Sequence, residues 1–262
     1  MNALRHFLLA LQFFTRVPVT GRLAAWVGYS PAMLRASAAH FPGVGWLVGG
    51  VAAGVFLLAQ AGLPPLAAAL LSTAATVWMT GAFHEDGLAD TADGLGGSAE
   101  RERALQIMKD SRIGSYGALA LVLALGIKIA LLAALAGQGA WAVAAAMLSA
   151  HVLSRLAPLA VIRTLPHVGD EGTSKSKPLA DALSGSALAV GAAWSLPALL
   201  PVAAAFGAAK AAAMVAAAAL AALWMGRLLR RRLQGFTGDG LGATQQLAEL
   251  AVYLALAWRW PA

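Results

Sequence analysis

The most informative segment of the chain is the acidic run HEDGLADTADG, residues 84–94. It places Asp86, Asp90 and Asp93 at positions i, i+4 and i+7. On a helix of 3.6 residues per turn, three side chains at this spacing fall within about 60° of arc, on one face. Carboxylates gathered on one stripe repel one another, and a divalent cation removes that repulsion. Oxygen ligands without His or Cys suit Mg²⁺, Mn²⁺ or Ca²⁺, so the spacing favours a hard-cation site over a solvated acidic loop.

Two further clusters have the residue types that such a site needs. The run KDSRIGSYG, residues 109–117, combines basic and hydroxyl groups just before an apolar segment. That pattern suits either an anion site at a helix N-terminus or a basic anchor at a membrane surface. The run GFTGDGLGAT, residues 235–244, repeats the Asp-Gly-Leu pattern and offers Asp239 as a fourth carboxylate.

Ionisable residues also occur inside apolar segments. Lys128 lies midway through one such segment, and His151 and Arg155 lie i, i+4 in the next. Charges at this depth usually face the interior of a helical bundle and mark a substrate or ion path. Arg155 could instead snorkel toward a membrane surface, and His151 fits a hydrogen-bonded core residue.

The composition of the chain indicates whether it folds in water or in a membrane. The chain has 262 residues, of which 60% are hydrophobic and 12% charged, with a net charge of +7 and no cysteine. So few charged residues cannot cover a soluble protein of this size, and so much apolar sequence excludes disorder. The lack of cysteine excludes disulfides and thiolate metal sites.

Apolar stretches of membrane-spanning length recur along the chain. We expect an all-α fold, a polytopic transmembrane helical bundle of about seven spans. An N-terminal amphipathic interfacial helix over Ala3–Val19 should precede it, because Arg5, His6, Gln12 and Arg16 interrupt its apolar residues. The predicted spans are Gly43–Gly62, Pro65–Phe83, Tyr116–Gly137, Trp141–Ile162, Ser186–Phe206, Ala211–Met225 and Leu247–Trp260.

The charged residues are distributed asymmetrically between the predicted loops. Most basic and nearly all acidic residues fall in the N-terminal segment 1–42 or in the loops 85–115, 163–185 and 227–245. Alternating spans put these segments on one side, which the positive-inside rule makes cytoplasmic, with the C-terminus outside. The basic charge therefore indicates membrane orientation, and we expect no nucleic-acid partner. We expect one integral membrane domain over 1–262, with its bundle in 43–262 and its active-site loops facing the cytoplasm.

Taken in order, these motifs resemble the cobalamin synthase family, the adenosylcobinamide-GDP ribazoletransferases. The resemblance rests on the acidic run, on Lys109–Gly114, Ser154-Arg155 and Thr237–Ala243, and on two N-terminal runs, QFFTRVP at 12–18 and FPGVGW at 41–46. It covers nearly the whole chain, and in the loop 163–185, which also carries Lys175 and Lys177, the shared residues are Glu171 and Gly172.

The resemblance implies a Mg²⁺-dependent transferase of the bacterial or archaeal cytoplasmic membrane. It would join adenosylcobinamide-GDP to α-ribazole, or to its 5′-phosphate, and release GMP. It leaves the oligomeric state open. We expect Asp86, Asp90, Asp93 and Asp239 to hold metal, and Asp93, with Asp86, to act in catalysis, Asp93 as the general base. We expect substrate contacts from His84, Lys109, Ser111, Arg112, Lys128, Arg155 and Thr237.

Two other functions fit parts of the sequence. A membrane enzyme like the CDP-alcohol phosphotransferases, with a lipid acceptor, would use a similar carboxylate pattern, but the Ala-Arg between two Asp pairs of that motif is missing here. A transporter would explain Lys128, His151 and Arg155 as a path. It would also need paired acids inside the spans, whereas Glu249 stands alone near the start of the last one.

Overall fold

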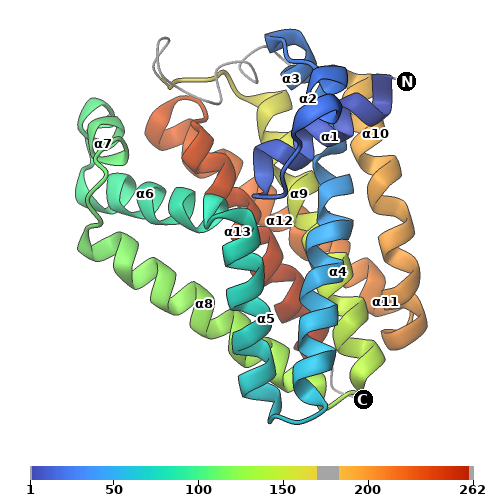
Figure 1. Ribbon diagram of the computed structural model, residues 1–262. Coiled ribbons are helices and arrows are strands. Elements are labelled where there is room, and N and C mark those ends of the chain that lie inside the picture. Colours follow the sequence, from blue (N-terminus) through green and yellow to red (C-terminus); the bar gives the residue numbers. More distant parts are fainter. Residues whose placement is uncertain (1, 170–182, 260–262) are drawn as a thin grey trace.

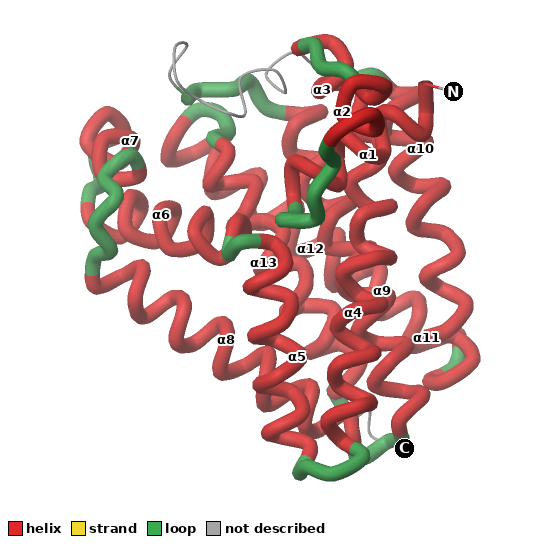
Figure 2. Tube along the Cα trace, in the orientation of Figure 1, coloured by secondary structure: helices red, strands yellow, loops and turns green. Residues whose placement is uncertain are grey.

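The computed structural model describes residues 2–169 and 183–259. Over these residues the chain is helical, and the β-pairing within them is one isolated bridge between His167 and Phe236 (Figure 2). The all-α prediction is confirmed. The helices are α1 (Asn2–Phe14), α2 (Gly21–Val27), α3 (Pro31–Ser37), α4 (Phe41–Gln60), α5 (Pro65–Thr80), α6 (Phe83–Gly97), α7 (Arg101–Met108), α8 (Ser115–Ala136), α9 (Ala140–Thr164), α10 (Gly185–Ser195), α11 (Leu199–Phe206), α12 (Ala208–Leu233) and α13 (Gly238–Ala257).

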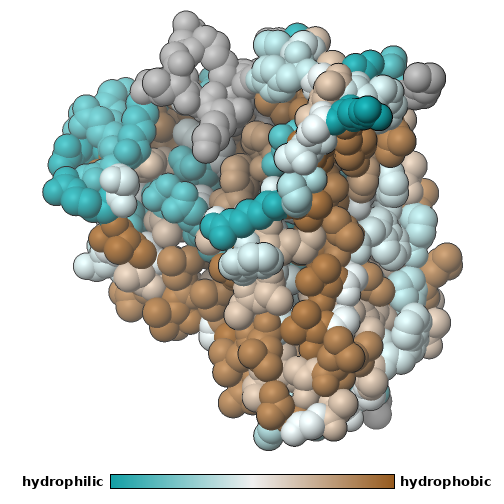
Figure 3. Space-filling view, viewed as in Figure 1, coloured by the Kyte–Doolittle hydropathy of each residue, from teal (hydrophilic) through white to brown (hydrophobic). Residues whose placement is uncertain are grey.

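Long helices packed side by side form the body of the molecule, with α1–α3 capping one end (Figure 1). From this body α6, α7 and α8 project as an arm, and α6 runs across the others. Hydrophilic residues gather over α1–α3 and over α6 and α7, whereas hydrophobic residues cover the lower parts of α4, α5 and α8 (Figure 3). The polar groups therefore collect at one end of the bundle, as the distribution of charge along the sequence indicates.

Five helical stretches in the described residues are long and apolar enough to cross a membrane. They are Pro31–Gln60, Ser115–Ala136, Ala140–Thr164, Gly185–Phe206 and Ala208–Leu233. The bent pair α5 and α6 gives a sixth if it counts as one span. Seven spans are not confirmed, because the last predicted span belongs to α13, which is not among these helices. The helix α1 ends at Phe14, before Val19, and its interfacial position stays a prediction.

Helix α13 starts much earlier than the sequence suggests. The predicted loop over 227–245 is wrong in extent, since α12 continues to Leu233 and α13 begins at Gly238. The loop over 85–115 is also largely helical, because it contains α6 and α7. The first half of α13 carries glycines and polar residues, so hydropathy does not indicate a spanning helix there. In the fold α13 contacts α6, α8, α9 and α12, and these neighbours shield its polar side chains.

A sharp bend between α5 and α6 sets the direction of the acidic run. The two helices meet at 89°. Gly81 and Ala82 both take left-handed backbone angles, with φ of 66° and 59°, and this ends α5. The amide of Ala82 donates to the Val77 carbonyl at 2.9 Å, and the amide of Arg16 donates to the Met79 carbonyl at 2.8 Å. The bend turns α6 across the polar end of the bundle.

Two glycines allow α6 and α13 to cross with their backbones in contact. A Cβ atom on Gly87 would lie 2.8 Å from the Asp239 carbonyl oxygen and 3.2 Å from the Cα of Gly242. A Cβ atom on Gly242 would lie 3.3 Å from the Cα of Gly87. Small residues are what such an approach requires. The crossing brings the acidic face of α6 to the first turn of α13.

A buried polar network joins α13 to its neighbours below this crossing. Lys128 Nζ on α8 lies 2.6 Å from Glu249 Oε1, and the two side chains are only 4% and 2% exposed. His151 Nδ1 on α9 lies 3.6 Å from Glu249 Oε2. Gln245 Nε2 donates to Glu249 Oε2 and to Ser154 Oγ, each at 2.9 Å. Buried charges are stable only when paired in this way.

We expect Gly87→Ala to destabilise the fold, because the new methyl group would overlap the backbone of α13. Overpacking of this kind costs about 1–3 kcal/mol. The midpoint of thermal unfolding in detergent measures the loss. The matched control is Gly126→Ala on the exposed face of α8, where a Cβ meets nothing within 4 Å. Equal midpoints for the two variants would contradict the close crossing.

We expect Lys128→Met to be more damaging than the double variant Lys128→Met/Glu249→Leu. Removing one partner of a buried pair costs about 3–5 kcal/mol, because the other charge stays buried, whereas replacing both partners costs far less. Thermal unfolding again measures both variants, with Arg231→Met on the exposed end of α12 as the control. If the double variant is the least stable, the ion pair is not the source of the effect.

Candidate active site

Three carboxylates meet at the polar end of the bundle. The acidic run is helical, as predicted, so Asp86 and Asp90 share a face of α6. Asp239 joins them from the first turn of α13, across the Gly87 contact. Asp86 is exposed, and Asp90 and Asp239 are half-buried. The cluster therefore faces the solvent side while its members stay close to one another.

The carboxylates of this cluster influence one another's charge. Burial raises the pKa of Asp90 to about 7, and the negative charges of Asp239, Asp86 and Asp93 add to that rise. Burial and the charge of Asp86 raise the pKa of Asp239 to about 6. Both residues lie outside the five spanning stretches. A cluster with this mutual repulsion favours binding of a proton or a cation.

The donor types suit a hard divalent cation, since all three are carboxylates. Among the described residues, however, no group of three or more His, Cys, Asp or Glu side chains is already arranged around one ion position. Asp86, Asp90 and Asp239 thus form a cluster of suitable ligands rather than a preformed coordination shell. Small rotations of exposed or half-buried side chains are what a cation would need there.

Asp93 is directed elsewhere. Its Oδ2 accepts a hydrogen bond from the amide of Gly114 at 2.7 Å, and its Oδ1 accepts one from the amide of Gly117 at 2.8 Å. Gly114 is the N-cap residue of α8, so the Asp93 carboxylate caps that helix. The same contact fills the helix N-terminus that the sequence offers as an anion site.

The predicted substrate-binding residues are spread over several environments. Arg112 is exposed and pairs with Asp110 at 2.6 Å, and Ser111 is exposed beside it. Lys109 ends α7 in the same loop. Lys128 lies in the core, paired with Glu249, away from this loop. The Thr237 hydroxyl accepts a hydrogen bond from the amide of Gly240 at 3.1 Å, which caps α13.

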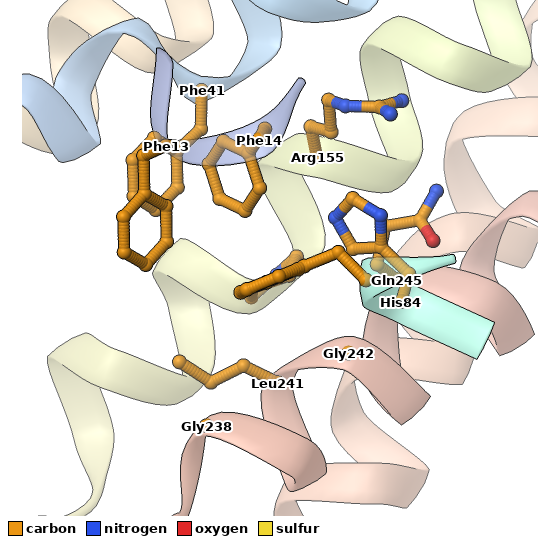
Figure 4. Close-up of a pocket in the computed structure, with 11 residues that line it drawn as sticks. Phe13, Phe14, Phe41, His84, Arg155, Gly238, Leu241, Gly242 and Gln245 are labelled. Carbon is orange, nitrogen blue, oxygen red and sulfur yellow. The ribbon is translucent and has the colours of Figure 1, made fainter. Parts of the chain in front are cut away.

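Arg155 and His84 line a small cavity where α1, α4, α6, α9 and α13 converge (Figure 4). Its volume is about 30 Å³, and four aromatic rings, those of Phe13, Phe14, Phe41 and Phe83, line it together with residues of α9 and α13. The His84 ring stacks on Phe14 with centroids 5.3 Å apart. Arg155 donates to the His151 carbonyl at 2.9 Å, but its buried Nε has no hydrogen-bond partner within the described part of the chain. The guanidinium of Arg155 therefore keeps one unused donor beside the cavity.

Several residues that build the site were not predicted. The sequence shows Glu249 as an acid near the start of the last predicted span, but nothing in its spacing indicates Lys128 as its partner. Arg232 donates to the carbonyls of Leu95 and Ser98 at 3.0 and 2.6 Å, so it caps the C-terminal end of α6. Arg101 donates to the Leu233 carbonyl at 2.8 Å. Lys175 and Lys177 lie outside the described residues.

Comparison with known proteins gives the same family over nearly the full chain. The family model described as cobalamin-5-phosphate synthase matches residues 6–257. A relative named adenosylcobinamide-GDP ribazoletransferase, from Polaromonas naphthalenivorans, is 58% identical, with 98% of this chain and 99% of the relative covered.

Relatives of the same name from Leptothrix cholodnii and Shewanella amazonensis are 53% and 44% identical. They cover 95% and 97% of this chain, and 94% and 95% of their own lengths. No solved structure matches the chain. The chain belongs to the cobalamin-5-phosphate synthase family.

Proposed function

We propose that this chain is an adenosylcobinamide-GDP ribazoletransferase. A ribose hydroxyl of α-ribazole, or of its 5′-phosphate, attacks the phosphorus linked to cobinamide. A new P–O bond forms, the P–O bond to GMP breaks, and the hydroxyl proton passes to a base. The products are adenosylcobalamin, or its 5′-phosphate, and GMP. Family membership and the similarity to relatives of that name support this assignment.

The observation that carries the mechanism is the carboxylate cluster of Asp86, Asp90 and Asp239. A pyrophosphate brings further negative charge, which these acids would repel without a counterion. Mg²⁺ bound by the three carboxylates would neutralise the phosphoryl oxygens. Asp93 and Asp86 are the two predicted catalytic acids. Because both oxygens of Asp93 accept amide hydrogen bonds, the exposed Asp86 is the better candidate base, through the carboxylate oxygen that the cation would leave free.

Arg155 is the candidate contact for a substrate phosphate. Its charge is buried, its Nε is unpaired in the described residues, and its cavity adjoins Gly238 and Gly242 at the crossing. Charge-assisted hydrogen bonds from arginine are the usual means of holding phosphate. Lys128 is better assigned to the core, because Glu249 already neutralises it.

A transporter is less consistent with the arrangement of the charges. Lys128, His151 and Glu249 interact with one another in a closed network, so they do not line a path. The chemistry is also one-sided, because the carboxylate cluster belongs to α6 and the first turn of α13, and hydrophilic surface gathers over α6 at one end of the molecule (Figure 3). We propose that this end faces the cytoplasm, because the positive-inside rule favours that side for the segments rich in Lys and Arg.

We expect purified protein in detergent or lipid to release GMP from adenosylcobinamide-GDP only when α-ribazole and Mg²⁺ are both present. EDTA should abolish the release. Asp90→Asn should lower kcat by roughly 10²–10⁴-fold, because it removes one carboxylate of the cluster. Glu102→Gln on the exposed face of α7 is the control. Turnover that survives EDTA would refute the metal assignment, and turnover with a CDP-linked donor and a lipid acceptor instead would refute the substrate assignment.

We expect Arg155→Gln to raise KM for adenosylcobinamide-GDP by roughly 10–100-fold, the loss of a charge-assisted hydrogen bond. Arg155→Lys should recover part of this affinity, since it keeps the charge but not the planar donor set. Initial rates over a range of donor concentrations measure both variants, and Arg231→Gln is the matched surface control. If Arg155→Gln has the KM of the unmodified protein for adenosylcobinamide-GDP, Arg155 does not contact the donor.

A further inference from the structure

Asp93 is almost fully buried, with 8% of its surface exposed. It lies on α6 one turn after Asp90 and reaches across to the start of α8, whereas Asp86 and Asp90 are open to solvent to different degrees. The two amides it binds, from Gly114 and Gly117, belong to the first turn of a 22-residue helix. The positive end of that helix dipole stabilises the charge of this carboxylate without a metal ion.

The glycines of the first turn of α8 form a cradle around this carboxylate. A Cβ atom on Gly114 would overlap the Asp93 carboxylate, because the three nearest atoms to it all belong to that group. A Cβ atom on Gly117 would overlap both that carboxylate and the Ala89 carbonyl. Gly114 has φ of −95°, so backbone strain does not require a glycine there. The Asp93 carboxylate occupies the space that a side chain at position 114 would need, and this explains the glycine.

The cradle ends the loop that carries Lys109, Ser111 and Arg112. The loop begins at the end of α7, where Met108 packs on Gly94, and it closes at Gly114. Each end of the loop is thus held against the second half of α6, one end by packing and the other by the two hydrogen bonds of Asp93. The two hydrogen bonds of Asp93 therefore hold the end of the loop that leads into α8.

We infer that Asp93 is a positioning residue and neither a metal ligand nor the general base. It fixes the loop 109–114 against the second half of α6, on the helix that carries Asp86 and Asp90, and so sets where the basic and hydroxyl groups of the loop can meet the nucleotide donor. This inference rests on the proposed function for the identity of the donor. The contact between Asp93 and the cradle is independent of the proposed function.

The first test compares Asp93→Asn with Asp90→Asn by Mn²⁺ binding, followed by electron paramagnetic resonance without substrates. Asp93→Asn should keep its Mn²⁺ Kd within about twofold of the unmodified protein, whereas loss of a true ligand in Asp90→Asn should raise it roughly 10–100-fold. In turnover, Asp93→Asn should raise KM for adenosylcobinamide-GDP roughly tenfold and change kcat by less than about threefold.

A double-mutant cycle with Gly114→Ala tests the cradle itself. Gly114→Ala should push the carboxylate away and reproduce the KM increase of Asp93→Ala. In the Asp93→Ala background the same methyl group meets no carboxylate, so Gly114→Ala should add nothing further. Hydrogen exchange of the amides of residues 114–117 should rise in each single variant. Additive effects of the two substitutions on KM would contradict the contact between Gly114 and the Asp93 carboxylate.

Two results would overturn the positioning role. A loss of Mn²⁺ affinity in Asp93→Asn as large as in Asp90→Asn would make Asp93 a ligand. A kcat loss of roughly 10²-fold or more, with KM and Mn²⁺ affinity unchanged, would make it the base. If the unmodified protein releases no GMP, the proposed function fails by itself, while the Mn²⁺ and hydrogen-exchange comparisons still decide the role of Asp93. If Asp93→Asn does not fold, Gly114→Ala displaces the same carboxylate and carries the same measurements.

Discussion

The site depends on the contact between α6 and α13, where Gly87 and Gly242 leave no side chain between the two backbones. This contact brings acids that are distant in the sequence to one point. Without it, Asp239 would stand away from Asp86 and Asp90. The same crossing forms one wall of the Arg155 cavity, since Gly238 and Gly242 line that cavity. A close backbone approach is rigid, so the site is held by main chain rather than by adaptable side chains.

The membrane imposes the second constraint, because a polar side chain inside the bundle must find its partner within the protein. Helix α13 meets this constraint by its position: α6, α8, α9 and α12 surround it, and Gln245, Gln246 and Glu249 hydrogen-bond or pair with them. The exposed faces of α8 and α12 are correspondingly apolar, with residues such as Leu123 and Leu220 on the outside. A long helix with several polar side chains is therefore an internal one.

The sequence predicted the features that depend on local periodicity and failed where tertiary contacts decide. The spacing alone predicts that Asp86, Asp90 and Asp93 lie on a helix, and in the structure all three belong to α6. Spacing says which way side chains face, but not which neighbour they meet, so Lys128 was assigned to substrate while Glu249 neutralises it. Hydropathy failed at α13 because it assumes a lipid neighbour, and this helix has protein neighbours. The bend at Gly81 and Ala82 was likewise hidden, since an alanine with φ of 59° has no sequence signature.

The acidic run also shows how one motif can hold carboxylates with different tasks. Asp90 and Asp93 are one turn apart on the same helix, yet the charge of Asp93 is stabilised by two amides and a helix dipole, whereas Asp90 faces other acids. A carboxylate that already has strong donors gains little from a cation, and one surrounded by like charges gains much. The different roles of the acids in the run therefore follow from the groups that each side chain contacts on the neighbouring helices. The same reasoning separates Arg155 from Lys128, because a buried cation with a carboxylate partner is structural and one with an unpaired donor is available to substrate.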